Sequence, residues 1–517
     1  MQTVQYESAQ HEADEQALVQ ANRAAALRAL AKRKPRSQEE GAEWVAALHR
    51  GFPSSEMGWT RDQWARAHDT FARGDHVELG ERLSFLLRTA SETTFTEGQF
   101  YQYGDHGVFW PVANAELSRL VQGFAGNWVA VGKDDEGKLK LKPLKLKSAD
   151  VKGAIAMAAD RADDPDFFSE AKPGIGFSRS FVEVTSCGIV QHECSPEHRA
   201  RVAYDFEFDP NAVPTLFLKT LEEIFRDDPD CEEKIDFLQE ITGMAIIGRG
   251  TQFQKAALLT GPGANGKSLA TSVIERCFPA ESVIAVPPQD FDQDYKRASF
   301  AGAKLNVVSE LPENEIVASE PWKAMVDGSK LSARSPYKDV FFFRPTAGHI
   351  YSANRLPGTA DHSQGFWRRW VVLTFNRTFA AHEQDATLAD RIIETERPAI
   401  VAWMLRGARW ALENGGYTIP PSSDKALAKW RSEADQVSSY VASECEPLPE
   451  GTAQTQWAKA SSVYADYQAW AIRTGHKAMS MVKFGERMQG LGLGSSERQG
   501  SGYRYPVRVL HKNETLQ

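Results

Sequence analysis

The stretch GPGANGKS, residues 261–268, has the residue types and spacing that hold the phosphates of a nucleotide. Gly261, Gly266, Lys267 and Ser268 fit the pattern G-x-x-x-x-G-K-[ST]. Glycines let main-chain N–H groups point at phosphate oxygens, and the positive end of the following helix favours the same anion. Lys267 is expected to reach the β- and γ-phosphates of ATP, and Ser268 to offer its hydroxyl to Mg²⁺. The predicted nucleotide-binding residues are Gly261, Pro262, Gly263, Ala264, Asn265, Gly266, Lys267, Ser268 and Leu269.

Two apolar runs further along the chain end in polar side chains that suit hydrolysis. AKLNVVSELPE, residues 303–313, predicts a buried strand followed by Glu310. A carboxylate there can polarise the attacking water or hold the water shell of the metal, whereas the alternative is a carboxylate that only faces solvent. GHIYSANRLP, residues 348–357, predicts a strand ending in Asn354, whose amide can sense the γ-phosphate and orient water.

A pair of arginines precedes a fourth predicted strand in GFWRRWVVLTF, residues 365–375. Arginine at such a place can reach the phosphate of a neighbouring subunit and stabilise the charge that develops during transfer. The alternative is a surface or salt-bridged structural pair, and the choice between Arg368 and Arg369 stays open. The predicted catalytic residues are Lys267, Glu310, Asn354, Arg368 and Arg369, and the predicted metal contacts are Ser268 and Glu310.

These residues need a sheet and helices to position them. The apolar run KAALLT, 255–260, predicts a strand before the glycine-rich stretch, and SLATSVIERCF predicts a helix after it. Strand-like runs then alternate with helices to about residue 420, which is the pattern of a mostly parallel sheet. Apolar residues at helical spacing predict two helices before that, around 212–227 and 231–247.

Composition limits the class of protein. A chain of 517 residues is too long for one hydrophobic core, so roughly two to four domains are expected. The net charge of −9 argues against a protein that is basic all over, although a ring or groove can concentrate cations locally. No apolar run is long enough to span a membrane, and the five scattered cysteines fit a reducing cytoplasm. A cytoplasmic protein without a membrane partner is therefore expected.

A lysine-rich stretch, GKLKLKPLKLK at 137–147, alternates lysine with leucine. The period is that of a strand and sets Lys138, Lys140 and Lys142 on one face. One interpretation is a basic edge that contacts a phosphate backbone. The other, which the sequence favours, is an edge strand that lysines protect from pairing with other chains.

The four pieces GPGANGKS, KLNVVSE, HIYSANRLP and FWRRW, in this order, resemble the superfamily-3 helicases, in particular the branch of phage and plasmid primase-helicases and the poxvirus primase-helicase. In that family the pieces are the Walker A loop, Walker B, the sensor asparagine and the arginine finger. By position these roles fall on Lys267 and Ser268, Glu310, Asn354, and Arg368 or Arg369. The sequence departs from the family at Ser309, because Walker B usually has two adjacent acids.

The resemblance extends to a hairpin that projects into the central channel of the ring in family members. Here the matching stretch is DGSKLSARSPYKDVFFFRP, 327–345, where Lys338 beside Tyr337 resembles the lysine at the hairpin tip. Arg334 lies just before the turn. A cation beside an aromatic ring suits single-stranded DNA, whereas the alternative is a solvated hairpin.

The resemblance also implies a domain order. It predicts an α/β fold with a P-loop AAA+-like ATPase core, an α+β N-terminal region, a helical collar and a C-terminal winged helix. The predicted boundaries are 1–84 for a helical region of unknown role, 85–210 for a domain like that preceding the motor in phage and plasmid primase-helicases, 211–250 for the collar, 251–420 for the ATPase and 421–517 for the winged helix. No primase catalytic triad is recognised in residues 1–200.

The predicted function is an ATP-dependent DNA helicase of a phage, plasmid or other mobile element. It would act as a homo-oligomeric ring, taken as a hexamer, on single-stranded or forked DNA in a bacterial cell or phage-infected host. A separate primase or other replication proteins are candidate partners. The alternative is an ATP-regulated replication initiator or scaffold that binds DNA without processive unwinding. A metabolite kinase is disfavoured because it leaves the collar and winged helix unexplained.

Overall fold

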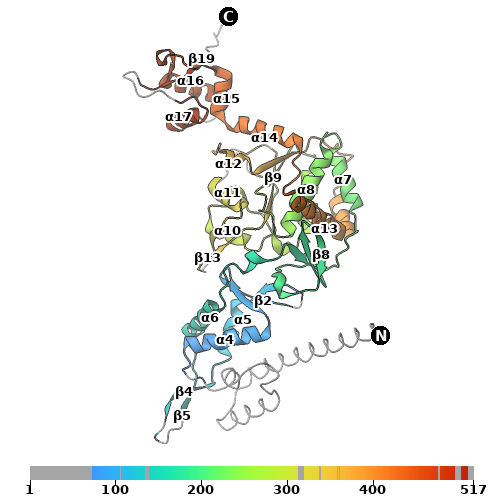
Figure 1. The fold of residues 1–517 in the computed structure, drawn as a ribbon, viewed down its shortest axis with the longest axis vertical. Helices are drawn as coiled ribbons and strands as arrows, with labels where there is room; N and C mark the ends of the chain where they lie inside the picture. The colour runs from blue at the N-terminus through green and yellow to red at the C-terminus, as the bar shows by residue number, and fades with distance from the viewer. Residues whose placement is uncertain are drawn as a thin grey trace. The chain divides into compact units, whose positions relative to one another are not determined.

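The computed structural model describes residues 71–510 except 72, 105, 134, 136–138, 312–318, 337–338, 355, 358, 360, 476–477 and 495–501. The chain divides into two compact units (Figure 1). The first consists of Met1–Val184, Gly188–Phe208 and Lys330–Arg344, and the second of Thr185–Cys187, Asp209–Ser329 and Pro345–Gln517. The predicted N-terminal region, 1–84, lies outside the described residues up to position 70. Among the helices of the described part, none has the length and apolar content needed to cross a membrane.

The first unit is α+β. Helices α4 and α6 pack against each other, and the buried side chains of both helices form one core with Phe100 and Val129. Its strands form two three-stranded sheets, β1-β2-β3 and β6-β7-β8, and two separate ribbons, β4-β5 and β12-β13. The elements are α4 (His76–Ala90), β1 (Thr93–Thr96), β2 (Gln99–Tyr103), β3 (Phe109–Pro111), α5 (Asn114–Gln122), β4 (Trp128–Lys133), β5 (Leu139–Pro143), α6 (Ser148–Ala162), β6 (Gly174–Gly176), β7 (Phe181–Thr185), β8 (Gly188–His192), β12 (Leu331–Arg334) and β13 (Val340–Phe343).

The second unit contains the predicted parallel sheet. Its five strands run in the order β10-β11-β14-β9-β15, and every adjacent pair is parallel, so the predicted mixed α/β fold with a parallel sheet is confirmed. The strands and helices up to the end of the sheet are α7 (Thr215–Phe225), α8 (Cys231–Ile246), β9 (Ala256–Thr260), α9 (Lys267–Cys277), β10 (Val283–Ile284), α10 (Asp294–Arg297), β11 (Leu305–Val308), α11 (Ser319–Val326), β14 (Gly348–Ala353), α12 (Gln364–Trp367) and β15 (Trp370–Thr374).

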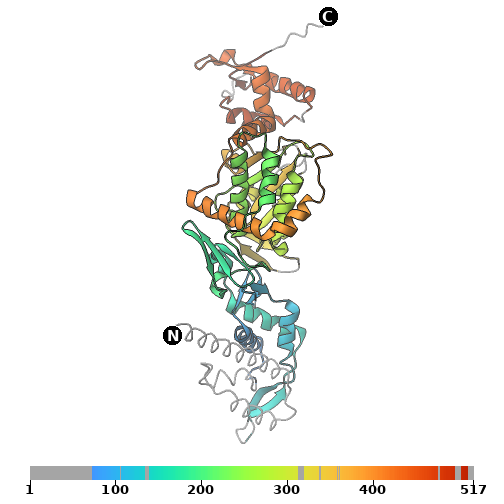
Figure 2. The same cartoon turned by 90° about the vertical axis from the view of Figure 1, so that its right-hand side faces the viewer.

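Burial of the central strands explains why their sequences are apolar without alternation. Ala256, Ala257, Leu258 and Leu259 of β9 are all 0% exposed, as expected for a parallel strand that is covered on both faces. Helices α8 and α9 pack against α13 (Leu388–Asn414), and Figure 2 shows them side by side. The close approach of α8 and α13 depends on Gly243, because a Cβ there would lie 2.0 Å from a carbonyl oxygen of α13.

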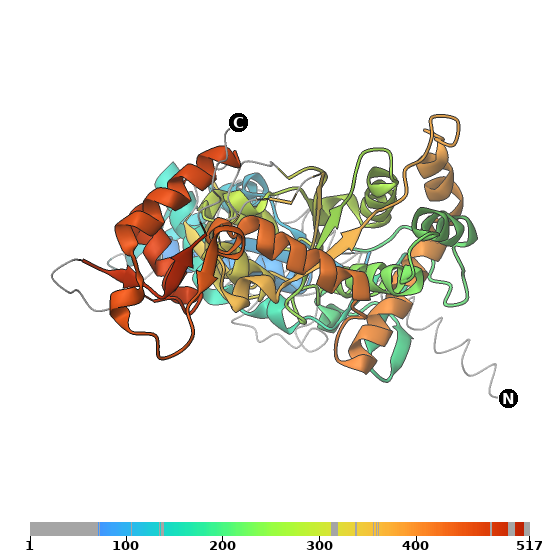
Figure 3. The same ribbon diagram turned by 90° about the horizontal axis from the view of Figure 1, so that it is seen from above.

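The C-terminal part of the second unit, whose helices are red in Figure 3, has a core of its own. Tyr440, Tyr467 and Phe484 are buried at the centre of three helices. The same part of the chain has two short antiparallel strand pairs, β16-β19 and β17-β18. The elements are α14 (Pro421–Ala434), α15 (Gln436–Glu444), β16 (Cys445–Pro447), β17 (Ala458–Lys459), α16 (Ala460–Arg473), α17 (Met481–Gly490), β18 (Arg504–Tyr505) and β19 (Val507–Val509).

Two central strands of the sheet, β11 and β14, carry buried polar side chains. Asn306 bonds both main-chain groups of Val286, donating to the carbonyl at 2.9 Å and accepting from the N–H at 2.8 Å. His349 Nδ1 lies 3.0 Å from the hydroxyl of Tyr351, while Nε2 has no partner among the described residues. Burial lowers the pKa of His349 to about 3, so the folded protein holds this imidazole neutral.

This imidazole predicts a loss of stability in weak acid. A histidine in the unfolded chain takes up a proton near pH 6.5, whereas His349 in the folded chain does so near its pKa of about 3. Between these values the unfolded state binds more protons, so stability falls as the pH falls. We expect His349 to lower the free energy of unfolding by about 2 kcal/mol between pH 8 and pH 5.

Denaturant unfolding of the wild type and His349→Gln at both pH values tests this prediction. Glutamine stays neutral and keeps an acceptor for Tyr351, so the variant should lose about 2 kcal/mol less than the wild type on acidification. An equal loss in both proteins would show that the acid sensitivity comes from other groups.

Candidate functional site: the carboxyl edge of the parallel sheet

The glycine-rich loop connects the carboxyl end of β9 to α9 and needs glycine at two of its pattern positions. Gly266 caps α9 with φ +87°, and a Cβ there would lie 2.7 Å from side-chain carbons of Ile224. Gly261 has φ +151°, and its Cβ would lie 2.3 Å from the carbonyl oxygen of Phe375. Both positions combine a left-handed backbone with a close contact, so a side chain at either one would displace the loop.

Lys267 is the first residue of α9, and its side chain contacts this loop. Its side chain is buried, and Nζ donates to the carbonyl of Gly261 at 2.6 Å, to the carbonyl of Pro262 at 3.3 Å and to Asn265 Oδ1 at 3.2 Å. Burial lowers the pKa of Lys267 below its usual value. All three acceptors are neutral oxygens, so the ammonium charge is available to an anion.

The other residues of the pattern differ in exposure, and hydrogen bonds to a neighbouring segment hold the loop in place. Pro262, Gly263, Ala264 and Ser268 are exposed and Leu269 is half-buried. Asn265 is buried, and its Nδ2 donates to the carbonyl of Phe375 at 3.2 Å. The N–H of Phe379 in turn donates to the carbonyl of Ala264 at 2.8 Å, so the segment after β15 holds the loop in place.

A buried lysine that the sequence analysis did not single out anchors this segment. Lys234 of α8 is 0% exposed and donates to the carbonyl of Thr374 at 2.8 Å. It also forms an ion pair with Asp228 at 2.8 Å, and Asn376 Nδ2 donates to the other oxygen of the same carboxylate at 2.7 Å. Helix α8 is therefore tied to the strand end that supports the glycine-rich loop.

Glu310 and Asn354 lie close together at the same edge of the sheet as the loop. Each follows the carboxyl end of its strand, β11 or β14, and these strands are neighbours in parallel register. Asn354 Nδ2 donates to Glu310 Oε1 at 3.4 Å, and both side chains are exposed. Because β14 also pairs with β9, the order β11-β14-β9 sets Glu310, Asn354 and the loop side by side.

The predicted metal contacts fit a hydrated magnesium ion that also contacts phosphate. Mg²⁺ usually takes one or two protein oxygens and completes its octahedron with phosphate and water oxygens. The exposed hydroxyl of Ser268 and the exposed carboxylate of Glu310 are such oxygens at one edge of the sheet. Within the described part of the chain no group of three or more His, Cys, Asp or Glu side chains could hold a metal without phosphate.

The two predicted arginines lie at the opposite edge, before the amino end of β15, and their environments differ. Arg369 is buried and forms a two-pronged ion pair with Asp327, in which Nε lies 2.7 Å from Oδ1. It also donates to the carbonyl of Gly365. Arg368 is exposed, and Nη1 donates to Gln254 Oε1 at 2.8 Å. The fold of one chain therefore does not bring either arginine to its own glycine-rich loop.

Arg368 borders a cavity of about 490 Å³ with two further cations, Lys255 and Arg431. Lys255 Nζ donates to the carbonyl of Arg368 at 2.6 Å, and Arg431 Nη2 donates to Gln364 Oε1 at 3.4 Å. Burial and the charge of Arg368 lower the pKa of Lys255. Three cations thus face one cavity, while Asp424 is the one carboxylate in its lining.

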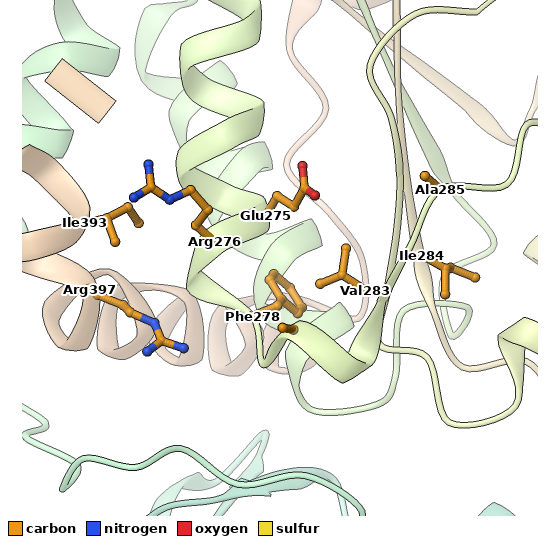
Figure 4. A pocket seen from close by; sticks show the side chains of 9 residues that line it. Glu275, Arg276, Phe278, Val283, Ile284, Ala285, Ile393 and Arg397 are labelled. Atoms are coloured by element: carbon orange, nitrogen blue, oxygen red, sulfur yellow. The ribbon is translucent and has the colours of Figure 1, made fainter. Parts of the chain in front are cut away.

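A second cavity, of about 450 Å³, lies beside the end of α9 and the edge strand β10 (Figure 4). Its lining combines Arg276 and Arg397 with apolar side chains such as Phe278 and Ile393. Arg276 Nη1 pairs with Asp390 at 2.7 Å. None of the predicted site residues lines this cavity.

The hairpin expected to contact DNA is the antiparallel ribbon β12-β13. Arg334 ends β12 and is exposed, whereas Tyr337 and Lys338 lie outside the described residues. The ribbon belongs to the first compact unit, where Lys330 Nζ lies 3.8 Å from Asp166 Oδ1.

Comparisons with known proteins find a family of unknown function and a low-identity relative that is named as a putative helicase. The profile of a family of unknown function, DUF5906, matches residues 259–369, from β9 to the pair of arginines. A protein of Acanthamoeba polyphaga mimivirus named "Putative helicase L207/L206" is 24% identical over 253 residues, which cover 45% of this chain and 25% of that protein. The match thus spans about a quarter of the length of the mimivirus protein.

Solved structures of the NrS-1 C-terminal region are also similar at low identity. One apo structure has a TM-score of 0.40 and 11% identity, covering 82% of this chain and 98% of that chain. Another has a TM-score of 0.39 and 11% identity, covering 84% of this chain and 99% of that chain.

Proposed function

We propose that the chain is an ATP-hydrolysing subunit of a ring-shaped DNA helicase from a phage, plasmid or other mobile element. The observation that carries the proposal is the meeting of the glycine-rich loop, Asn354 and Glu310 at the carboxyl ends of β9, β14 and β11, with the amide and carboxylate 3.4 Å apart. The weak similarity to the mimivirus protein named as a helicase supports it.

Within one subunit, these residues have complementary roles in ATP hydrolysis. The main-chain N–H groups of the loop and Lys267 hold the phosphates, and Mg²⁺ would neutralise part of their charge. Glu310 accepts a proton from the attacking water, whose oxygen bonds to the γ-phosphorus as the bond to the β–γ bridging oxygen breaks. Asn354, which already bonds Glu310, keeps the carboxylate turned toward that water. The products are ADP and phosphate.

The arginine comes from a neighbouring copy in this proposal. Arg368 and the cavity it borders lie at the amino edge of the sheet, opposite the nucleotide edge. A head-to-tail contact between copies would bring this edge against the phosphates of the next subunit, and repeated contacts of this kind close a ring. Arg368 is the better candidate for the finger, because Arg369 is buried against Asp327. The hexamer follows from the family resemblance.

DNA would contact the hairpin residues Arg334, Tyr337 and Lys338, of which the last two lie outside the described residues. The C-terminal helices α16 and α17 with their short ladders support the proposal of a winged-helix-like domain. On α17, Arg487 is engaged with Asp435, with Nε and Oδ2 2.8 Å apart, whereas Lys483 is exposed. A separate primase or other replication protein would complete the machinery.

The Glu310→Gln variant tests the proposed role of the carboxylate. Glutamine keeps the shape and the bond from Asn354 but cannot take a proton, so hydrolysis should fall about 100-fold while ATP still binds. Phosphate release, fluorescent-nucleotide binding and strand displacement of forked DNA measure the three steps. Glu281→Gln is the matched control, because this exposed carboxylate precedes the amino end of β10.

Unchanged hydrolysis in Glu310→Gln would contradict the assignment of the site. Strand displacement separates the motor from the alternative function. A wild-type protein that hydrolyses ATP and changes its affinity for DNA with nucleotide, but separates no strands, would be the ATP-regulated initiator or scaffold.

A further inference from the structure

The ribbon β4-β5 forms an arm on the first unit that the proposed ATPase does not use. In Figures 1 and 2 it extends beyond the helices α4, α5 and α6. Its base is fixed, because Val129 and Leu144 are buried in the core of the unit and Phe71 pairs with Val129. The strands pair in antiparallel register with a bulge between Ala130 and Gly132, which increases their twist.

Three lysines of this ribbon are exposed cations. Lys140 and Lys142 occupy alternate positions of β5, and Lys145 follows two residues after the strand ends. All three side chains are exposed, and none of them forms an ion pair with a described residue. Lys140 pairs with Gly132, where an added Cβ would meet nothing within 4 Å, so its surroundings are open. We call these three residues the lysine row.

The lysine row is a local excess of positive charge on an acidic protein. The segment between the two strands has Asp134, Asp135 and Glu136, whereas no aspartate or glutamate occurs from Leu139 to Ser148, and the whole chain carries a net charge of −9. Exposed cations that are not neutralised by neighbouring carboxylates attract a polyanion.

The alternative role of the lysines, keeping the strand edges from pairing with another chain, does not explain where they lie. In a two-stranded ribbon both strands are edges, yet β4 presents Val131, which is 49% exposed. Pro143 and the bulge at Gly132 already hinder pairing with another chain. Lys145 lies beyond the end of β5 and has no strand edge to protect.

We propose that the ribbon β4-β5 is a nucleic-acid arm whose lysine row contacts the phosphate backbone of double-stranded DNA. A two-stranded ribbon has the size that the major groove admits, and lysine contacts phosphate as a point charge without regard to sequence. Single-stranded DNA is disfavoured because its binding sites use stacked aromatic rings. Among the described residues of the ribbon, the one aromatic is Trp128 at its base.

This inference shares only the DNA partner with the proposed ATPase, so the two are tested apart. The full chain carrying Lys140→Gln, Lys142→Gln and Lys145→Gln is titrated onto a fluorescent duplex without nucleotide, over a series of salt concentrations. The affinity should fall by roughly ten- to hundredfold, and the slope of log affinity against log salt should flatten by about 2.7. The same three positions changed to arginine should retain the wild-type affinity, because the charge remains.

The control carries Lys152→Gln, Lys219→Gln and Lys425→Gln, three exposed lysines outside the ribbon, and should bind nearly as the wild type does. Equal duplex affinity of the ribbon and control variants would overturn the proposal. The same variants are titrated onto single-stranded DNA and onto anionic vesicles. A loss confined to single-stranded DNA, a larger loss on vesicles than on duplex, or self-association of the glutamine variant without a loss of duplex affinity would also overturn the proposal. ATP hydrolysis without DNA is measured in parallel, because its absence would contradict the ATPase and leave the ribbon result standing.

Discussion

Lys267→Ala is expected to lower the rate of ATP hydrolysis by a factor of about 10³. Nζ of Lys267 is surrounded by the carbonyls of Gly261 and Pro262 and by Asn265 Oδ1, all of them neutral. Its ammonium is therefore the one full positive charge that the loop itself offers to the β- and γ-phosphates. Alanine removes that charge from the place where negative charge develops in the transition state.

A stability measurement distinguishes a loss of catalysis in Lys267→Ala from a loss of folded protein. The lysine is buried and burial lowers its pKa, so keeping its ammonium charged in the folded state costs free energy. The melting temperature of Lys267→Ala should therefore stay near that of the wild type, as should that of Lys219→Ala, whose lysine is exposed on α7. Steady-state phosphate release and thermal unfolding check both. Hydrolysis by Lys267→Ala within tenfold of the wild type would contradict the phosphate role of the lysine.

Local patterns in the sequence were sufficient to predict the sheet and the loop. The run of apolar residues in β9 followed by the glycine pattern predicts a strand, a tight loop and a helix, and the structure has β9, the loop and α9 in that order. The polar residues after β11 and β14 were predictable for the same reason, because parallel strands end at a common edge. The distance of 3.4 Å between Asn354 Nδ2 and Glu310 Oε1 was not predictable, because it depends on which strands are neighbours.

Contacts between distant parts of the chain could not be predicted from local patterns. Asn265 and Phe375 are 110 residues apart, and Asp327 and Arg369 are 42 residues apart. Nothing in the neighbourhood of Asp327 indicates its partner, and its sequence context predicts the start of a DNA-contacting hairpin. Adjacent arginines look alike in sequence, so only the fold reveals that one is buried and the other exposed.

Lys234 is a residue that the sequence could have revealed. It lies four residues before Leu238, so the helical period places it on the buried face of α8. A lysine on an apolar face needs a partner, and Asp228 and Asp230 are close in sequence. Its additional bond to Thr374, 140 residues away, required the structure.

Arg368→Ala is expected to lower hydrolysis by about 10³ while leaving stability nearly unchanged. Arg368 is exposed, and replacing it breaks a bond to Gln254 at 2.8 Å. Arg369→Ala should instead destabilise the protein by about 3 kcal/mol, because Asp327 would lose the partner of a largely buried ion pair. Phosphate release and denaturant unfolding distinguish the two variants, and the opposite pattern would assign the finger to Arg369.

Mixed rings decide whether the site is shared between copies. A subunit with Arg368→Ala still has the complete nucleotide edge, and a subunit with Lys267→Ala still has the arginine edge. In an equal and random mixture about one quarter of the interfaces would join an intact nucleotide edge to an intact arginine, so hydrolysis should recover to about that fraction. The control mixture, Lys267→Ala with Glu310→Gln, should recover nothing, because both changes damage the same edge and no interface becomes complete. No recovery in the first mixture, although the subunits exchange, would mean that each chain hydrolyses ATP without its neighbour's arginine. Recovery in the control would mean that Lys267 and Glu310 do not act at the same nucleotide edge.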